Sequence, residues 1–175
     1  MCCARTPRSA PITRRSEDRQ AVSDLQAPNP MSVFEIETIT AITPSVADGI
    51  AALVRQLSSS AKTPTKEELE TIVNSPATIL LAANQSSRLV GMLTLVIFPI
   101  PTGKRAIIED VVVDERYRGQ GVAQALTQEA LVQAEAAGVR TVDLTSRPSR
   151  EAANRLYQKL GFQKRDSNVY RYTPR

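Results

Sequence analysis

The chain has no histidine, which limits the acid–base chemistry that its side chains can perform. This absence excludes Ser–His–Asp and Cys–His nucleophilic sites and every metal site that needs histidine ligands. The two cysteines, Cys2 and Cys3, are adjacent at the N-terminus, so they cannot staple the fold. We therefore expect chemistry that uses carboxylates, hydroxyls, backbone amides and a bound cofactor, and no metal.

The stretch RGQGVA, residues 118–123, has the residue types of an anion-binding turn. A helical pattern follows it, and the first amides of a helix have no internal partners and lie at the positive end of the helix dipole. Glycines let such amides converge without Cβ clashes, and Arg118 adds a positive charge. The pattern predicts that this loop binds a diphosphate.

Other interpretations of this loop fit less well. A dinucleotide-binding fingerprint would need a third glycine where Gln124 stands, and no Gly-Lys-Ser/Thr of a Walker-type loop is present. A glycine-containing turn into a helix without any ligand remains the structural alternative.

Two carboxylates interrupt the apolar run IIEDVVV, residues 107–113. An unpaired carboxylate among Ile and Val is costly, so Glu109 and Asp110 are candidate acid–base residues. Adjacent strand residues face opposite sides, so only one of them is expected to look into a cleft. The alternative is a structural ion pair, for example with Lys104 or Arg105.

A third candidate, Tyr157, lies on a predicted helix over residues 149–160. The spacing i, i+4, i+7 places Arg150, Asn154 and Tyr157 on one face of this helix. We expect the opposite stripe to pack inward; it contains Ala152, Ala153, Leu156 and Leu160.

The elements that must position these residues are predicted from periodicity and from turn residues. A strand at 32–39 and helices at 43–57 and 63–75 come first. Three meander strands follow at 77–85, 88–98 and 105–113, then a helix at 121–137, a strand at 139–146 and the helix at 149–160. A final strand pair is expected at 162–166 and 168–173. This order predicts one mixed α/β domain over residues 31–175.

Composition excludes several classes of function. The net charge is +4, aromatic residues make up 4% and tryptophan is absent, which is not the clustered basic and aromatic surface of a nucleic-acid binder. No apolar run approaches the ~20 residues of a membrane span. We expect no nucleic-acid partner, no membrane contact and, because cysteines are few, a cytoplasmic location.

Residues 1–30 show no periodicity and are rich in Pro, Ser and Arg. We expect a disordered tail or sequence upstream of a true start at Met31. The alternative is an organelle transit peptide, because the first 16 residues contain Arg and Ser but no acid.

The chain resembles the Gcn5-related N-acetyltransferase (GNAT) family over roughly Val33 to Tyr172. Arg118, Gly121 and Ala123 match the pyrophosphate loop of that family in register, and NRLYQKLGF, residues 154–162, resembles its last helix. The resemblance implies an α/β fold with a mixed, mostly antiparallel sheet of six to seven strands, splayed between strands 4 and 5 and flanked by about four helices.

The resemblance also implies acetyl-CoA as the cofactor. Its pantetheine arm would pair with the main chain of Val111 and Val113, and an amide of Val111 or Val112 would polarise the thioester carbonyl. Asn154 and Tyr157 would also contact the cofactor. The diphosphate would bind the loop residues Arg118, Gly119, Gln120, Gly121, Val122 and Ala123.

By the same resemblance, Tyr157 would donate a proton to the departing sulfur, and Glu109, rather than Asp110, would be the base. The alternative for Tyr157 is a core tyrosine. Arg150 stands where many relatives have an asparagine that contacts the cofactor, so Asn154 could take over that contact or Arg150 could reach a phosphate. The loop 145–149 could touch the acceptor through Ser146 or Arg147, or it could be a polar loop in which Ser149 caps the helix.

We therefore expect an N-acetyltransferase that transfers an acetyl group directly, in a ternary complex, to a primary amine of a small molecule. The alternatives are a protein lysine or N-terminal acetyltransferase and a non-catalytic acyl-CoA sensor. IEDVVV, residues 108–113, also resembles the glucosamine-6-phosphate acetyltransferase branch. A homodimer is compatible with the resemblance.

Overall fold

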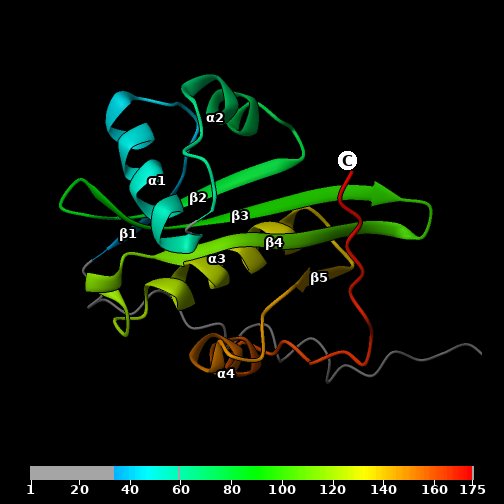
Figure 1. Cartoon of the computed structure of the whole chain (residues 1–175). Helices are drawn as coiled ribbons and strands as arrows, with labels where there is room; N and C mark the ends of the chain where they lie inside the picture. The colour runs from blue at the N-terminus through cyan, green and yellow to red at the C-terminus, as the bar shows by residue number, and fades with distance from the viewer. Residues whose placement is uncertain (1–33, 59, 175) are drawn as a thin grey trace, which may run out of the picture. The chain divides into compact units, whose positions relative to one another are not determined.

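A computed structural model describes residues 34–58 and 60–174 (Figure 1). Their elements are β1 (Glu35–Thr38), α1 (Pro44–Leu57), α2 (Lys66–Val73), β2 (Thr78–Gln85), β3 (Arg88–Ile100), β4 (Gly103–Val113), α3 (Val122–Ala136), β5 (Thr141–Leu144) and α4 (Glu151–Lys159), with a 3-10 turn at Glu115–Tyr117 between β4 and α3. The predicted order is confirmed as far as α4. The prediction for residues 1–30 lies outside the described residues.

The strands form one sheet in the order β1-β2-β3-β4-β5. The first four are antiparallel neighbours, whereas β4 and β5 run parallel. The parallel pairing begins at Arg105–Thr141 and ends at Ile108–Leu144, while β4 continues to Val113. The far end of β4 therefore has a neighbour, β3, on one side only.

The prediction of six to seven strands was wrong, because the described residues contain five. The expected pair at 162–166 and 168–173 has neither helix nor strand structure. Alternating residues suggested a strand pair there, but Tyr170 and Tyr172 are 88% and 86% exposed, so the second predicted strand buries no apolar face. A hairpin without a buried face is marginal in water, and the connection contains no glycine for a tight turn.

Two apolar layers cover the sheet, one on each face (Figure 1). Helix α3 packs on one face through Val122, Leu126 and Ala130, against Leu93 and Ile108 of the sheet. Helices α1 and α2 pack on the other face. Their layer contains Ile50, Leu53 and Leu69 from the helices and Met92 and Val112 from the strands.

A β-bulge in β4 changes which side chains face each layer. Met92 pairs with Val112 and Thr94 pairs with Glu109, so β4 has one extra residue here. Asp110 has φ 51°, an uncommon left-handed value for a non-glycine residue that suits a bulge. As a result Ile108 lies in the α3 layer while Val112 lies in the opposite layer.

Candidate active site

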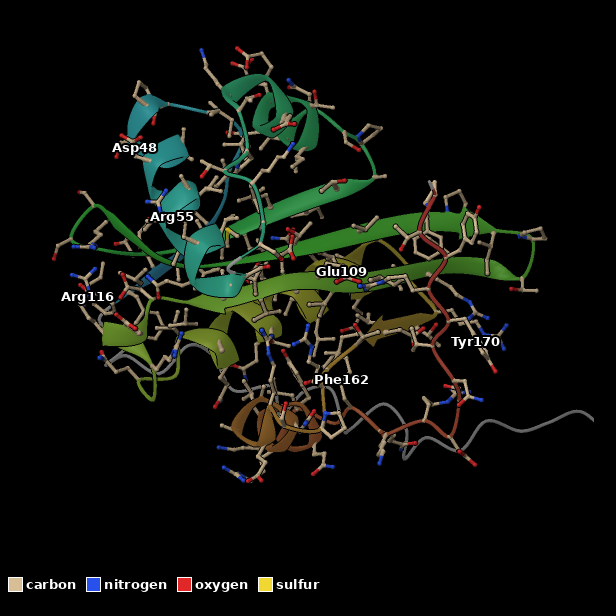
Figure 2. The ribbon with its side chains drawn as sticks, viewed as in Figure 1. Asp48, Arg55, Glu109, Arg116, Phe162 and Tyr170 are labelled. Carbon is tan, nitrogen blue, oxygen red and sulfur yellow. The ribbon has the colours of Figure 1, made fainter. Side chains whose placement is uncertain are left out.

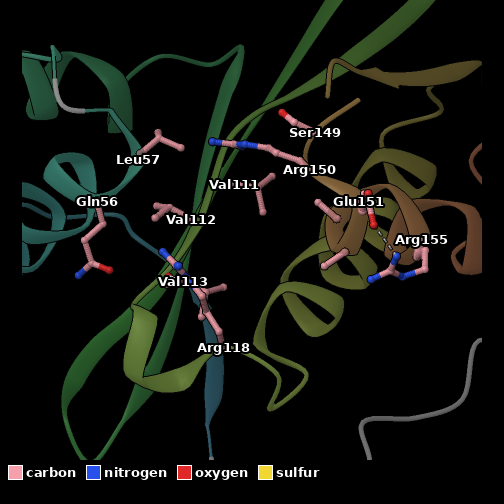
Figure 3. A pocket seen from close by; sticks show the side chains of 12 residues that line it. Gln56, Leu57, Val111, Val112, Val113, Arg118, Ser149, Arg150, Glu151 and Arg155 are labelled. Atoms are coloured by element: carbon pink, nitrogen blue, oxygen red, sulfur yellow. Dashed lines mark hydrogen bonds and ion pairs between the residues drawn. The ribbon is translucent and has the colours of Figure 1, made fainter. Parts of the chain in front are cut away.

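A cleft with a volume of about 610 Å³ lies beside the part of β4 that β5 does not pair. Figure 3 shows β4 along the middle of this cleft, α4 on one side and the end of α1 on the other. Of the residues predicted for the site, Val111, Val112, Val113 and Arg118 line it. The remaining lining residues are Gln56, Leu57, Ser149, Arg150, Glu151, Ala152, Ala153 and Arg155.

The loop before α3 has backbone amides without protein partners. Gly119 and Gly121 have φ 76° and 87°, which glycine adopts without strain. No side chain caps α3 at Gly121, and the first helical bond runs from Ala125 N to Gly121 O at 3.0 Å. Residues 118–121 form a turn, and within the described residues no amide of 119–124 makes a well-aligned hydrogen bond to a protein acceptor. A Cβ atom at Gly119 or Gly121 would meet nothing within 4 Å, so the loop borders open space.

Close packing of α3 on β3 fixes the position of this helix start. A Cβ atom at Gly91 would lie 2.9 Å from Cγ1 of Val122 and 3.2 Å from Cδ1 of Leu126. Only glycine allows this approach, so the first turn of α3 lies directly on β3. Arg118, just before the loop, donates from Nε to Val113 O at 3.3 Å and so links the loop to the end of β4.

Asp114 holds the turn between β4 and the loop, and the sequence reasoning missed it. Its carboxylate is 3% exposed, and it accepts from Arg116 Nε at 3.0 Å and Arg116 Nη2 at 2.7 Å. These hydrogen bonds lower the pKa of Asp114 to about 2, and Arg88 on β3 lies 3.7 Å away. The charged stretch DERYR, residues 114–118, contained the signal, because a carboxylate two residues before an arginine can cap a turn and pair with it.

The unpaired side of β4 presents main-chain groups to the cleft. Asp114 N donates to Val90 O of β3 at 2.9 Å, so the peptide groups of the preceding residue point away from β3. The Arg118 bond to Val113 O confirms this direction. On this edge the Val113 N–H is therefore open to an extended ligand, while the Val113 carbonyl is held by Arg118.

Tyr157 is half-buried on α4 and does not line the cleft. Its ring packs edge-to-face on Phe162, with centroids 5.8 Å apart. Burial raises the pKa of Tyr157 above its usual value, and the charge of Arg150 partly opposes this effect. The phenol is thus protonated at neutral pH and able to donate a proton.

Asn154 and the small residues of α4 lie differently from the prediction. Asn154 Nδ2 donates to the carbonyl of Arg147 at 3.0 Å, so it ties the loop before α4. Ala152 and Ala153 were expected to pack inward, but both line the cleft. Helix α4 has no fully buried residue, because only part of its apolar stripe has a layer to pack against.

Glu109 and Asp110 are both exposed, so the alternation argument does not separate them. The bulge at Asp110 breaks the alternation on which that argument depends. Ile108, the strand neighbour of Glu109, lies in the α3 layer, so Glu109 faces the side of the sheet that carries α1 and α2 (Figure 2). Neither carboxylate forms an ion pair within the described residues, and Lys104 Nζ instead donates to Ala137 O at 2.7 Å.

The loop before α4 differs from the prediction at the cap. Arg150, not Ser149, stands at the N-cap position, and no side chain caps the helix. Ser149 and Arg150 instead line the cleft. The buried Oγ of Ser146 has no hydrogen-bond partner within the described part of the chain, whereas Arg147 is exposed.

A family model described as the acetyltransferase (GNAT) family matches residues 50–162, which is more than half of the chain. The chain belongs to the GNAT family. The matched region spans the described parts of the cleft, from α1 to Phe162. A comparison with curated protein sequences gives no match.

Solved structures with GNAT-like folds superpose on the chain at low sequence identity. An acetyltransferase from Trypanosoma brucei has a TM-score of 0.67 at 25% identity, over 80% of this chain and 99% of that one. An aminoglycoside acetyltransferase from an uncultured soil metagenomic sample has a TM-score of 0.72 at 18% identity, over 81% of this chain and 96% of that one. Glucosamine-6-phosphate N-acetyltransferase from Arabidopsis thaliana has a TM-score of 0.69 at 20% identity, over 81% of this chain and 99% of that one.

GNAT enzymes use acetyl-CoA as cosubstrate, and the glycine loop of this chain fits its diphosphate. The fit depends on the free amides at 119–124 and on the open space beside the two glycines. Within residues 34–58 and 60–174, no group of three or more Cys, Asp or Glu residues could hold a metal ion. In the same residues, no helix has both the length and the apolar composition of a membrane span.

Proposed function

We propose that this GNAT protein is an acetyl-CoA-dependent N-acetyltransferase that acetylates a primary amine of a small molecule. The observation that carries the proposal is the continuity of the binding surface. The free amides at 119–124 adjoin Arg118, and Arg118 is bonded to the open strand edge at Val113. A diphosphate on the loop and an extended arm along β4 would use this surface together.

The chain's own residues supply the rest of the reaction. Acetyl-CoA supplies an acetyl group that is activated as a thioester. The exposed Glu109 carboxylate accepts the proton of the acceptor ammonium, directly or through water, so that the amine becomes nucleophilic. The Tyr157 hydroxyl on α4, which lies outside the residues that line the cleft, would give a proton to the sulfur, and its raised pKa keeps it protonated. An amide at Val111 or Val112 stabilises charge on the carbonyl oxygen.

Direct transfer in a ternary complex agrees with the composition. The chain has no histidine, and its only cysteines are Cys2 and Cys3. Among the described residues that line the cleft, no cysteine or histidine is present to take the acetyl group first. Initial-rate plots at several concentrations of both substrates should intersect, and parallel lines would contradict direct transfer.

A small-molecule acceptor is the first choice because two of the similar structures are named for acetylation of aminoglycosides and of glucosamine-6-phosphate. The remaining candidates, a protein amine and a non-catalytic sensor, are separated from it by the assay below.

The test combines binding and turnover on the full chain. Acetyl-CoA at about 100 times its Kd should raise the free energy of unfolding by about 2.7 kcal/mol. Release of free thiol should then be measured with amino acids, amino sugars, polyamines, aminoglycosides and lysine peptides, and the acetyl-amine identified by mass spectrometry. Stabilisation without any thiol release would favour the sensor. The absence of both stabilisation and thiol release would refute the proposal.

A further inference from the structure

The two ends of the cleft each carry an arginine (Figure 3). Arg118 lies beside Val113, next to the glycine loop. Arg150 lies at the other end, beside Val111, and its guanidinium extends across the cleft toward Leu57 of α1. Val111 and Val113 are two positions apart on the strand, a distance of about 7 Å.

The four charged residues that line the cleft differ in their partners. Glu151 pairs with Arg155 at 3.4 Å, so these two charges compensate each other. Arg118 is bonded to Val113 O at 3.3 Å. The Arg150 side chain has no hydrogen-bond or ion-pair partner within residues 34–58 and 60–174. An exposed guanidinium aimed across a cleft, with no acceptor among the described residues, is available to an anionic ligand.

The cofactor does not need this second positive charge, if the proposed function holds. All phosphates of coenzyme A lie on the nucleotide side of its pantetheine arm. With the diphosphate on the glycine loop and the arm along Val113 and Val111, the phosphates occupy the Arg118 end. Arg150, at the start of α4, then lies at the end where the acceptor enters, beside Val111, which is two residues along β4 from the exposed carboxylate Glu109.

We propose that Arg150 binds an anionic group of the acceptor, so that the substrate is a primary amine that also carries a carboxylate or a phosphate. On this arrangement β4 carries the exposed Glu109 carboxylate, just before the cleft-lining Val111, for the ammonium group, and Arg150 in the cleft offers a guanidinium for the anion. Polycationic amines fit this arrangement poorly because Arg150 repels them. The inference rests on the proposed function and deepens it.

The test uses matched pairs of acceptors and matched variants of the full chain. The pairs are amino acids with their carboxamides and amino sugars with their 6-phosphates, and a polyamine is added. Wild type should prefer the anionic member of at least one pair by about 10- to 100-fold in kcat/KM, the scale of a charge-assisted hydrogen bond. The pair that shows the preference distinguishes carboxylate from phosphate.

Arg150→Gln should abolish that preference through a higher acceptor KM, and Arg150→Lys should retain part of it. The control is Lys159→Gln, which removes a positive charge from an exposed position on the same helix outside the cleft. It should change neither the preference for the anionic acceptor nor the acceptor KM. The Kd of coenzyme A, measured by calorimetry, should stay within about twofold in Arg150→Gln.

Three results would overturn the inference while leaving the proposed function intact. The first is a preference for uncharged or polycationic amines. The second is a chain that binds coenzyme A but has no activity on any anionic amine. The third is a higher Kd for coenzyme A in Arg150→Gln. The last result would make Arg150 a cofactor ligand. If the wild-type chain does not bind coenzyme A, the proposed function itself is refuted.

Discussion

The two walls of the cleft differ in how firmly they are built into the fold. The β4 wall is paired along β3, and its Ile108 and Val112 lie in opposite apolar layers. Buried Asp114 then fixes the turn that leads to the glycine loop. The α4 wall has no fully buried residue, and the segment after it, residues 162–174, is mostly exposed.

This difference separates two tasks. The firm wall presents backbone groups, and backbone groups recognise a ligand that every family member shares. The looser wall presents side chains, such as Arg150, that can change without disturbing the sheet. Apart from the candidate base Glu109, we therefore expect changes on the β4 side to affect cofactor binding and stability, and changes on the α4 side to affect turnover and acceptor choice.

The largest effect should follow from Gly121→Glu. A carboxylate in the loop repels the diphosphate, and a side chain is strained at φ 87°. We expect the Kd of coenzyme A, measured by calorimetry, to rise by about 100-fold or more, the scale of a lost charge-assisted contact plus repulsion. Gly138→Glu is the matched control, because Gly138 follows the other end of α3 with φ 70° and equal open space. Equal loss of binding in both variants would contradict the loop assignment.

Glu109→Gln should lower kcat/KM by about 100-fold if this carboxylate is the base. Asp110→Asn is the comparison, because asparagine tolerates the left-handed backbone at φ 51° and should alter the rate by about threefold at most. Steady-state rates of both variants decide between the two carboxylates. A larger loss of kcat/KM in Asp110→Asn than in Glu109→Gln would identify Asp110 as the base instead.

Asp114→Asn should cost about 2 kcal/mol of stability at pH 7, because it breaks the buried pair with Arg116. The folded pKa of about 2 lies below the ordinary 3.8. The contribution is therefore complete above pH ~3.8 and is lost as the pH falls through about 2. Urea unfolding at several pH values checks this, and a wild-type advantage that does not shrink in acid would show that the charge of Asp114 is not the cause.

The smallest effect should come from the looser wall. Tyr157→Phe keeps the ring on Phe162 but removes the proton donor, so kcat should fall about 10-fold with little change in the Kd of coenzyme A. Tyr170→Phe, at an 88% exposed position, is the control. Unchanged kcat in Tyr157→Phe would remove this residue from the mechanism.

Local signals predicted the firm wall well. The apolar alternation located β2 and β3, Gly138 and Gly161 marked the ends of α3 and α4, and RGQGVA located a loop whose amides have no partners. These features depend on neighbours in the sequence, which is why periodicity and glycine positions reveal them.

The rest depends on contacts that the sequence does not display. The bulge at Asp110 follows from the pairing with β3, and it decides which face Glu109 takes. The predicted last strand pair fails because no described element covers Val169, Tyr170 and Tyr172. The burial of Asp114 could not be predicted from its neighbours in the sequence, because it depends on Arg88 and Val90 of β3.

A crystal structure of the full chain with coenzyme A tests the central claim most directly. We predict diphosphate oxygens within hydrogen-bond distance of the amides of residues 119–124 and a pantetheine arm paired with the main chain of Val113. A diphosphate bound anywhere else on the protein would contradict the account of the cleft and of both its walls.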